Sequence, residues 1–276
     1  MLQKTHLIVP MAGSGVRFRE AGYESYKPLI TIANRPMIDY VLGNFPKSMA
    51  KHLIIHSDYL SASEKKYLVA KSDVILHEIK AHSLGPAYSL SLASETLPLE
   101  ESWFVSYCDV AWVWDFKAVR KNLDSDAIAF THQKFHPHLV KDNSYAFCRV
   151  EDTRLLEIKE KGSFTKNWMQ EPVSAGVFYF KKGWDLITAI AKQMEQHQKV
   201  QGEYFPSLAL NELLKNQKRV TTQEVDFFLH WGTPEQLQDF LKWQKILTTS
   251  TSHEETPEYL FWKNNYFKFM ESFKEG

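Results

Sequence analysis

The sequence predicts an α/β fold in which a mainly parallel, mixed sheet is flanked by helices, with an additional helical segment at the C-terminus. Within the first 125 residues, apolar runs of strand length alternate four times with segments of helical character. The chain has 276 residues, of which 44% are hydrophobic, enough for one large core. A single domain is therefore expected over residues 1–246, although two compact domains are also possible at this length.

The N-terminal half is expected to supply the parallel strands. "HLIVPM" at 6–11 is a short apolar run that leads into glycines, which is typical of a buried strand. Three further strands are expected at 52–57, 73–79 and 103–109. The intervening helices are expected at 35–45, 63–71 and 85–97, the last with Pro86 near its start. Each strand is thus followed by a crossover of the kind that joins parallel strands.

The pattern changes after Asp124, where apolar segments follow one another without long helices. Strands are expected at 127–132, 145–151, 155–160 and 174–180, as a mixed or antiparallel extension of the same sheet. Helices are then expected at 184–196 and 204–216, a late strand at 219–231, and a helix at 233–247 with Thr233 as N-cap. Residues 247–276 are expected to form a linker and an aromatic helix. This helix either packs on the domain or makes a contact between subunits of a homo-oligomer.

Composition excludes several classes of protein. Lys plus Arg equals Asp plus Glu at 33 each, so the zero formal charge argues against a general nucleic-acid binder. Two cysteines, Cys108 and Cys148, cannot form a disulfide framework. The N-terminus reaches glycine too early for a signal peptide, and no apolar stretch approaches the length of a membrane span. We expect a cytoplasmic protein without membrane partners.

The segment "VPMAGSGVRFREAGYESYKPLI", residues 9–30, is the strongest chemical signal. Glycines directly after a strand let backbone N–H groups approach an anion, and cations nearby add charge. Gly13 and Gly15 fit a dinucleotide fingerprint, but Phe18 stands where its third glycine should be. A P-loop would need Gly-Lys followed by Ser or Thr, and the segment has none. What remains is a Gly-Ser-Gly-Val-Arg loop with Lys27 ten residues beyond Arg17.

This segment, continued as "ITIANRPMIDYVL", resembles the signature of the sugar-1-phosphate nucleotidylyltransferases in the NTP transferase family. Tyr26 replaces the usual first proline of the Pro-Lys-Pro motif, whereas Lys27 and Pro28 are kept. The resemblance implies a single GT-A-like, Rossmann-like domain. It further implies in-line attack by an acceptor phosphate on the α-phosphorus of an NTP. The nucleotide-binding residues that it implies in this segment are Met11, Ala12, Gly13, Ser14, Gly15, Arg17 and Lys27.

Two later segments resemble the same family at its nucleotide side. "HSLGPAYSL" resembles the segment that cradles the base, which implies base contacts for Gly85 and, more loosely, for Lys80. "WFVSYCDV" places Asp109 at the carboxyl end of a strand, where a carboxylate would hold Mg²⁺ bridging the nucleotide phosphates. Arg17, Lys27 and Asp109 are therefore the implied catalytic residues. A glycosyltransferase of the related fold would carry Asp-x-Asp here, whereas Ala111 follows Val110.

The acceptor side and the last motif follow in order along the chain. "IKEKG" and "SAGVFYF" resemble the paired segments that grip the acceptor, which implies acceptor contacts for Glu160, Lys161 and Gly176. "FFLHWGTPEQL" resembles the closing motif, but His230 stands where many relatives have a second metal-binding aspartate. Histidine is a poor ligand for Mg²⁺. Either Asp109 holds the metal ion with phosphates and water, or His230 contacts phosphate or acceptor directly.

These features predict a nucleotidyltransferase that joins an NTP to a phosphorylated acceptor, most plainly a sugar 1-phosphate, and releases pyrophosphate. The motifs resemble those of relatives that act in bacterial surface-polysaccharide pathways. Three alternatives remain open: a CTP-dependent cytidylyltransferase acting on a non-sugar phosphate, a GT-A glycosyltransferase, and an inactive nucleotide-binding regulatory protein. The base and the acceptor are not determined by the sequence.

Overall fold

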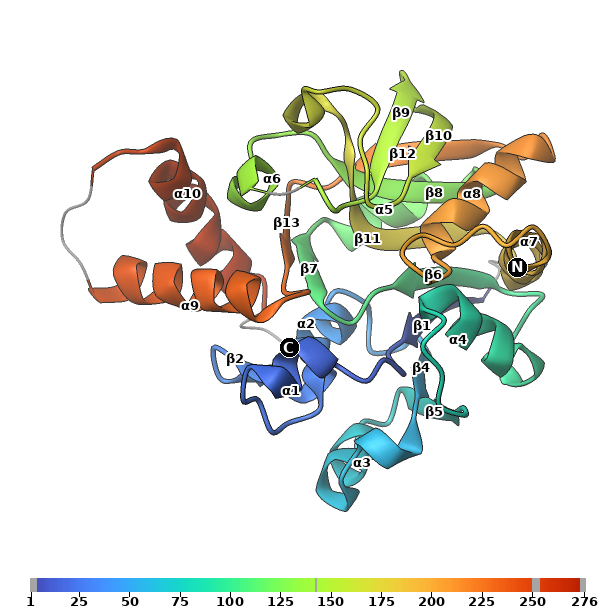
Figure 1. Cartoon of the computed structure of the whole chain (residues 1–276), viewed down its shortest axis with the longest axis horizontal. Helices are drawn as coiled ribbons and strands as arrows, with labels where there is room; N and C mark the ends of the chain where they lie inside the picture. The colour runs from blue at the N-terminus through green and yellow to red at the C-terminus, as the bar shows by residue number, and fades with distance from the viewer. Residues whose placement is uncertain (1–3, 142, 250–253, 274–276) are drawn as a thin grey trace.

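The computed structural model describes residues 4–141, 143–249 and 254–273. Its centre is a nine-stranded mixed sheet with the strand order β5-β4-β1-β6-β11-β8-β12-β10-β9 (Figure 1). The predicted α/β fold with a mixed sheet flanked by helices is confirmed. The parallel strands are β1 (Thr5–Pro10), β4 (Lys51–Ile55), β5 (Val74–Glu78) and β6 (Ser102–Ser106).

The strand β1 shows why the sheet must be covered on both faces. Leu7 and Val9 belong to one hydrophobic core, whereas Ile8 between them belongs to a second core on the opposite face. Successive side chains of a strand point to opposite faces, so a continuous apolar run requires helices on both. The first core receives α2 (Met37–Gly43), α3 (Ala62–Val69) and α5 (Phe116–Lys121). The second receives α4 (Pro86–Ala93), α7 (Gly183–Glu195) and α8 (Pro206–Lys215).

The second half of the sheet is mixed. The long strand β11 (Val173–Phe180) runs antiparallel to β6 on one side and to β8 (Ala127–His132) on the other. Beyond β8 lie β12 (Val220–Glu224), β10 (Arg154–Lys159) and β9 (Phe147–Glu151). Only β12 is parallel to its neighbour β8, so the expected mixed or antiparallel extension is confirmed.

The single late strand expected at 219–231 is wrong, because the chain breaks into two strands that belong to different sheets. After β12, the amide of Val225 donates to the carbonyl of Thr131, and Asp226 is exposed and paired with Lys268. The chain resumes as β13 (Phe227–His230), which pairs antiparallel with β7 (Val110–Val113). The exposed Asp226 lies at this break, and Asp is a residue that strands disfavour. The break carries His230 next to Asp109.

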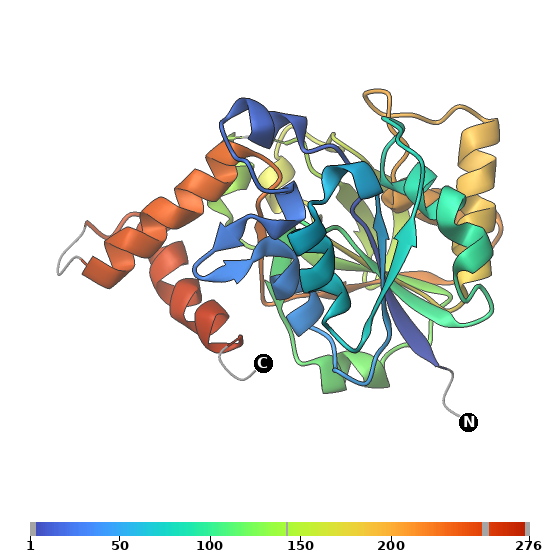
Figure 2. The same ribbon diagram turned by 90° about the horizontal axis from the view of Figure 1, so that it is seen from below.

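The C-terminal helices α9 (Pro234–Thr249) and α10 (Pro257–Glu271) form a pair at one side of the sheet domain (Figures 1 and 2). They close a third core, which also takes Phe18 from α1 (Val16–Glu20) and Leu229 from β13. Of the α10 aromatics, Trp262 and Phe269 are completely buried, whereas Phe267 is 54% exposed. The helix α9 runs three residues past the expected boundary at 246, and part of the expected linker lies outside the described residues.

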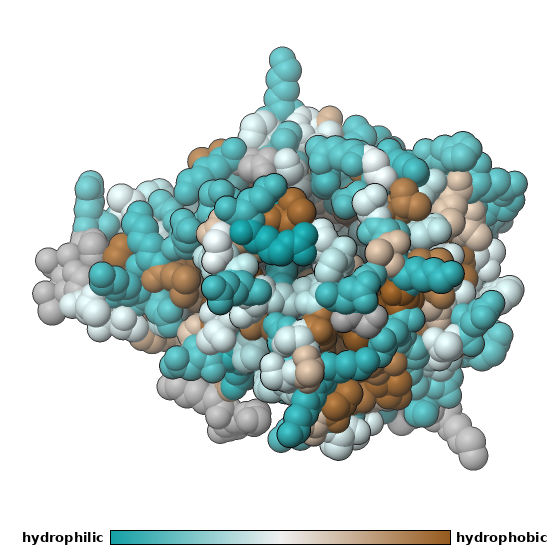
Figure 3. Space-filling view, turned by 60° about the horizontal axis from the view of Figure 1, so that its bottom comes forward, coloured by the Kyte–Doolittle hydropathy of each residue, from teal (hydrophilic) through white to brown (hydrophobic). Residues whose placement is uncertain are grey.

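The outer surface is mainly hydrophilic on the face shown in Figure 3, where apolar side chains gather in separate patches. Among the described residues, no helix is both long and apolar enough to cross a membrane. The remaining short elements are β2 (Thr31–Ile32), β3 (Arg35–Pro36) and α6 (Pro137–Lys141).

Candidate active site

A cleft of about 850 Å³ opens beyond the carboxyl ends of β1, β5 and β6. In open α/β sheets ligands bind at this edge, because the crossovers diverge there. All but one of the residues predicted to form the site line the cleft: Met11, Ala12, Gly13, Ser14, Gly15, Arg17, Lys27, Gly85, Asp109, Glu160, Lys161, Gly176 and His230. The exception is Lys80, which is exposed and lies outside the cleft lining, whereas its neighbours Ala81 and His82 line it.

The loop after β1 owes its shape to one glycine. Gly15 has a φ of 64°, in the left-handed region, and caps the N-terminus of α1. A Cβ atom at this position would lie 3.0 Å from Cβ of Lys27. Glycine is therefore required both by the backbone and by the close approach of the two segments. The short helix α1 is fixed by buried Phe18, and exposed Arg17 lies at the rim of the cleft.

Tyr26, the residue that departs from the usual proline, ties the two ends of the loop together. Its phenol donates a hydrogen bond to the carbonyl of Met11, and its amide donates to Glu64 at 3.1 Å. Burial raises the pKa of Tyr26 well above its usual value, so the phenol remains a donor. The tyrosine thereby fixes the start of the 3-10 turn Lys27–Leu29, from which Lys27 enters the cleft.

Lys27 and Asp109 form the electrostatic centre of the cleft. Nζ of Lys27 lies 2.5 Å from Oδ2 of Asp109, and each side chain is 15% exposed. Burial alone would raise the pKa of Asp109, but Lys27, together with His230 and a backbone hydrogen bond, lowers the pKa to about 2. Asp109 is consequently a carboxylate at every pH of interest. Nζ of Lys27 also lies 3.5 Å from the carbonyl oxygen of Gly232.

His230 completes this centre. Its Nε2 lies 3.7 Å from Oδ2 of Asp109, and its ring packs edge to face on Tyr145 with 5.4 Å between centroids. Burial lowers the pKa of His230 to about 4, although Asp109 opposes the shift, so the imidazole is neutral at pH 7. A Cβ on Gly232 would lie 2.4 Å from Cε1 of His230, so this glycine provides the space for the ring. His230 is 26% exposed and accessible from the cleft.

Gly85 lies at the end of the cleft where the base was expected. Its φ is 87°, and an added Cβ would lie 2.7 Å from the carbonyl oxygen of Tyr204. The glycine is thus required by the approach of residues 203–204 as well as by its turn. His82 is the first residue of the segment predicted to cradle the base, although no role was assigned to it. A ring nitrogen of His82 lies 2.9 Å from Oγ of Ser89, and His82 lines the cleft beside Gly85.

Close to Gly85, across residues 203–204, lie the residues expected to grip the acceptor. Oγ of Ser207 donates to Oε2 of Glu160 at 2.5 Å. Burial raises the pKa of Glu160 to about 7. Nζ of Lys161 lies 2.9 Å from Oε1 of Gln201 and 3.8 Å from Oε2 of Glu203. Two carboxylates and one ammonium therefore surround this part of the cleft.

Gly176 also lines the cleft. It interrupts the register of β11 against β8 and has a φ of 76°. A Cβ here would lie 2.9 Å from Cγ1 of Val110 and 3.0 Å from Cδ2 of Tyr107. The glycine thus lets β11 bulge toward Val110 and Tyr107 at the position where the acceptor was expected to lie.

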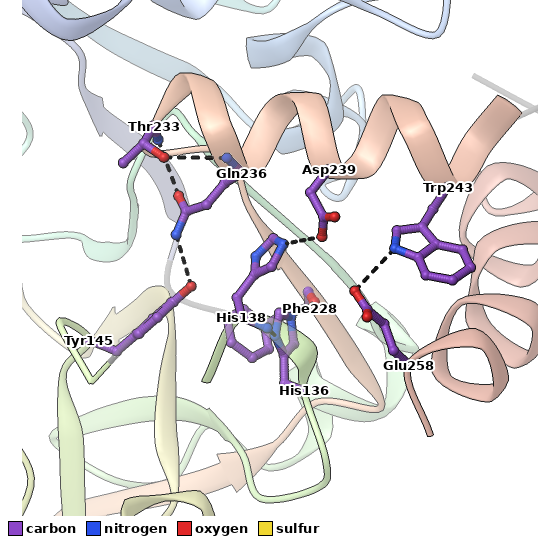
Figure 4. A network of polar contacts seen from close by, with 9 residues as sticks. All are labelled: His136, His138, Tyr145, Phe228, Thr233, Gln236, Asp239, Trp243 and Glu258. Atoms are coloured by element: carbon purple, nitrogen blue, oxygen red, sulfur yellow. Dashed lines mark hydrogen bonds and ion pairs between the residues drawn. The ribbon is translucent and has the colours of Figure 1, made fainter. Parts of the chain in front are cut away.

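A polar network attaches α9 to the lining expected to bind the acceptor (Figure 4). Thr233 and Gln236 exchange hydrogen bonds at the helix start, and Nε2 of Gln236 donates to the Tyr145 phenol at 3.1 Å. One turn later, His138 Nε2 lies 3.1 Å from Oδ2 of Asp239. Thr233, Gln236 and Tyr145 line the cleft; Thr233 and Gln236 lie within the closing motif, where no site role was predicted for Gln236, and no motif indicated Tyr145. The Gln236–Tyr145 and His138–Asp239 contacts join residues 91 and 101 positions apart, which local patterns do not reveal.

The residues that the structure describes contain no group of three or more His, Cys, Asp and Glu side chains placed to hold a metal ion. Asp226 is not among the residues that line the cleft; it lies at the break before β13 and pairs with Lys268. A divalent ion at this site would therefore need oxygens from the nucleotide in addition to Asp109. Such an arrangement fits the chemistry of Mg²⁺, which often binds through one or two carboxylates, phosphates and water.

A cleft at the carboxyl ends of the parallel strands is where α/β proteins of this class bind their ligands, nucleotides among them. Residues 7–199, more than half of the chain, match the family model described as the MobA-like NTP transferase domain. The chain belongs to this family. The resemblance to the NTP transferases that the motifs indicated is confirmed.

Curated relatives are remote in sequence. The mannose-1-phosphate guanylyltransferase catalytic subunit beta of Drosophila pseudoobscura pseudoobscura is 21% identical over 269 residues, covering 92% of this chain and 65% of the relative. The bifunctional protein GlmU of Staphylococcus epidermidis is 22% identical over 222 residues, covering 76% of this chain and 46% of the relative. The chain thus spans between about half and two thirds of the length of these relatives.

A solved structure supports the same fold. The nucleoside-diphosphate-sugar pyrophosphorylase from Vibrio cholerae RC9 superposes with a TM-score of 0.69 at 19% identity, covering 86% of this chain and 99% of that one. At this identity the likeness concerns the fold.

Proposed function

We propose that the protein is a nucleotidyltransferase that couples an NTP to a phosphorylated acceptor, of which a sugar 1-phosphate is the first candidate, and releases pyrophosphate. The observation that carries the proposal is the composition of the cleft described above. The glycine loop, Arg17, Lys27 and Asp109 line one part of it, and Glu160 and Lys161 line another. Two polyanions can therefore be held side by side.

The reaction asks the protein for alignment and charge compensation. A phosphate oxygen of the acceptor attacks the α-phosphorus, the bond from that phosphorus to the bridging oxygen breaks, and pyrophosphate leaves with its electron pair. The amides of Gly13–Gly15 would donate to the triphosphate, and Arg17 would bind its outer phosphates through a fork of hydrogen bonds. Lys27 would stabilise the charge that develops on the α-phosphate.

The remaining roles belong to the carboxylates and to Lys161. Asp109 would hold a divalent cation, for which the sequence suggests Mg²⁺, and the ion would neutralise phosphate charge. Because Lys27 contacts Asp109 at 2.5 Å, nucleotide binding would shift the ammonium toward the α-phosphate. Lys161 would bind the acceptor phosphate, and Glu160 would accept a hydrogen bond from an acceptor hydroxyl. The names of the relatives, which include a mannose-1-phosphate guanylyltransferase and a nucleoside-diphosphate-sugar pyrophosphorylase, support a sugar 1-phosphate as the first candidate acceptor.

The test is a pyrophosphate-release assay with ATP, CTP, GTP and UTP, each combined with several sugar 1-phosphates and with non-sugar phosphates. The proposal expects a signal that requires both an NTP and a phosphorylated acceptor. Nucleoside diphosphate release from a nucleotide sugar would instead indicate a glycosyltransferase. Nucleotide binding without turnover on any acceptor would indicate a regulatory protein.

A further inference from the structure

We propose that His6, His52 and His77, here called the histidine row, form a one-proton switch inside the sheet. A single proton held at the His6 end of the row sets the direction of all its hydrogen bonds. Loss of that proton reverses them and removes a hydrogen bond from the last residue of α4. This inference does not depend on the function proposed above.

The histidine row crosses three neighbouring parallel strands. His6 lies on β1, His52 on β4 and His77 on β5, and all three side chains are buried. The strand register pairs Ile8 with His52 and Ile54 with His77. Side chains two residues apart on a strand share a face, so the imidazoles follow one another diagonally across the strands on the face of the second core.

Each imidazole contacts the next, and both ends of the row have a polar partner. Nδ1 of His6 lies 2.9 Å from Nε2 of His52, and Nδ1 of His52 lies 2.8 Å from Nε2 of His77. At one end, Nε2 of His6 contacts a carboxylate oxygen of Glu101. At the other end, Nδ1 of His77 lies 2.7 Å from Oγ1 of Thr96. Four contacts therefore link five side chains in one continuous chain of hydrogen bonds.

The hydrogen atoms available determine the direction of these contacts. The Thr96 hydroxyl donates to the carbonyl oxygen of Ala93 at 3.0 Å, so Oγ1 accepts from Nδ1 of His77. A neutral imidazole has one N–H, so His77 in turn accepts from Nδ1 of His52, and His52 accepts from Nδ1 of His6. His6 has then used its only N–H, although its Nε2 faces the carboxylate at the end of the row. One further proton, shared by this imidazole and the carboxylate, completes all four contacts.

Without that proton, the same four contacts can be made only in the opposite direction. The Thr96 hydroxyl then turns to donate to Nδ1 of His77, and each imidazole carries its proton on Nε2. The hydrogen bond from Thr96 to the carbonyl of Ala93 is lost. Ala93 is the last residue of α4, and the N-cap of this helix is the cleft residue Gly85. The proton therefore changes how the end of α4 that lies away from the cleft is held.

The surroundings favour the extra proton at His6 and keep the other two imidazoles neutral. Burial, followed by the neighbouring imidazoles and Lys4, lowers the pKa of His52 to about 3. Burial also lowers the pKa of His77. Glu101 is the carboxylate that balances an imidazolium at His6, because the two side chains are in contact.

Other charged side chains next to the row form ion pairs of their own. Lys51 and Glu78, each adjacent in sequence to a histidine of the row, point to the opposite face of the sheet. The ion pairs are Lys51 with Asp73, Glu78 with Lys65, and Glu100 with Lys182. Glu101 and Lys4 are therefore the charges that act on the row.

Nitrogen-15 NMR of the full chain tests the switch, because it shows which ring nitrogen carries each proton. The histidine rings are labelled with ¹⁵N, assigned by through-bond correlation to the backbone, and titrated between about pH 5 and 9. At the acid end we expect His6 to be doubly protonated and His52 and His77 to be Nδ1–H tautomers. As the pH rises, all three should become Nε2–H tautomers with one common midpoint. His52 and His77 should stay neutral throughout.

Thr96→Ala removes the acceptor at the far end of the row. Three N–H groups then satisfy the three contacts that remain, so His52 and His77 should be Nε2–H tautomers at every pH. Ser94→Ala is the matched control. Ser94 belongs to the same 3-10 turn and donates the same kind of hydroxyl bond, to the carbonyl of Ser91 at 2.8 Å. This variant should keep the reversal seen in the wild type.

The outcomes decide the inference without reference to catalysis. A common reversal in the wild type and in Ser94→Ala, absent from Thr96→Ala, supports the switch. The switch is wrong if the tautomers of His52 and His77 do not change with pH, or if either imidazole becomes charged in the folded protein. A reversal that survives in Thr96→Ala, or one that Ser94→Ala also abolishes, overturns the role of Thr96 and with it the switch.

Discussion

Two parts of the cleft, the triphosphate loop and the lining expected to bind the acceptor, are built in different ways. In the first, one continuous segment of chain, residues 11–27, supplies the glycine loop and both cations. In the second, the lining comes from at least four distant segments, which include Tyr145, Glu160, Glu203 and Gln236. A segment that acts alone must keep its residue types at fixed spacing. An assembled surface can distribute the same task over many positions, so each of its residues should matter less.

The sharpest test of this contrast is Lys27→Ala, which removes the cation expected to act in the transition state. Loss of one such donor typically costs about 10²–10³ in kcat. We expect kcat and kcat/KM to fall together by that factor, since an interaction made only in the transition state affects both equally. Steady-state pyrophosphate release measures the change. Lys117→Ala, at an exposed position on α5, is the matched control. A Lys27→Ala enzyme with nearly normal kcat would remove Lys27 from the chemical step.

Glu160→Gln probes the acceptor lining and should have a smaller effect. The change keeps the shape of the side chain but removes its charge and weakens the bond to an acceptor hydroxyl. Hydrogen bonds to charged groups are worth about 1.5–3 kcal/mol, so the acceptor KM should rise about tenfold or more. The KM for the NTP should change little. If the NTP and acceptor KM values rose together, Glu160 would support the cleft as a whole.

The same residue predicts a pH dependence. Burial raises the pKa of Glu160 to about 7, so the carboxylate forms only as the pH rises through that value. Acceptor KM should therefore fall between about pH 6 and 8 in the wild type and stay flat in Glu160→Gln. The effect on stability has the opposite sign. Protonated Glu160 favours the folded state, and that contribution is present below about pH 4.5 and lost as the pH rises toward 7 and above.

Features that depend on local spacing could be predicted from the sequence, whereas features assembled from distant segments could not. The alternation of strands and helices and the glycine loop depend on local spacing, and their positions agree with the structure within a few residues. The break at Asp226 was missed because "VTTQEVDFFLH" contains no glycine or proline to mark the end of a strand. Only the pairing of β13 with β7 shows that two strands are present. Tyr145 and Gln236 were missed because their contact joins residues 91 positions apart. Lys80 was assigned to the site from a loose resemblance. It is exposed and lies outside the cleft lining, whereas His82 two residues later lines the cleft.

A third change tests whether the local loop depends on its conformation as well as its residue types. Gly15→Ala introduces a Cβ at a φ of 64° and 3.0 Å from Cβ of Lys27. The left-handed conformation costs a non-glycine residue about 1–2 kcal/mol. We expect the loop to shift and the KM for the NTP to rise several-fold, while thermal unfolding shows a modest loss of stability. Gly13→Ala is the internal comparison, because a Cβ there meets nothing within 4 Å. Equal effects of the two changes would contradict a conformational role for Gly15.

The smallest effect is expected from Gln236→Ala, in the assembled lining. The substitution removes the hydrogen bond that Gln236 Nε2 donates to the Tyr145 phenol and the one that the Thr233 amide donates to Gln236 Oε1. Each neutral hydrogen bond contributes about 1 kcal/mol, and helix α9 remains held by its buried Leu237 and Phe240. We therefore expect a slight loss of thermal stability and an acceptor KM raised by only about twofold. Gln238→Ala lies two residues away on the exposed face of the same helix and should change neither quantity. A drop in activity as large as that of Lys27→Ala would mean that the acceptor lining depends on single residues after all, and the contrast between the two parts of the cleft would be lost.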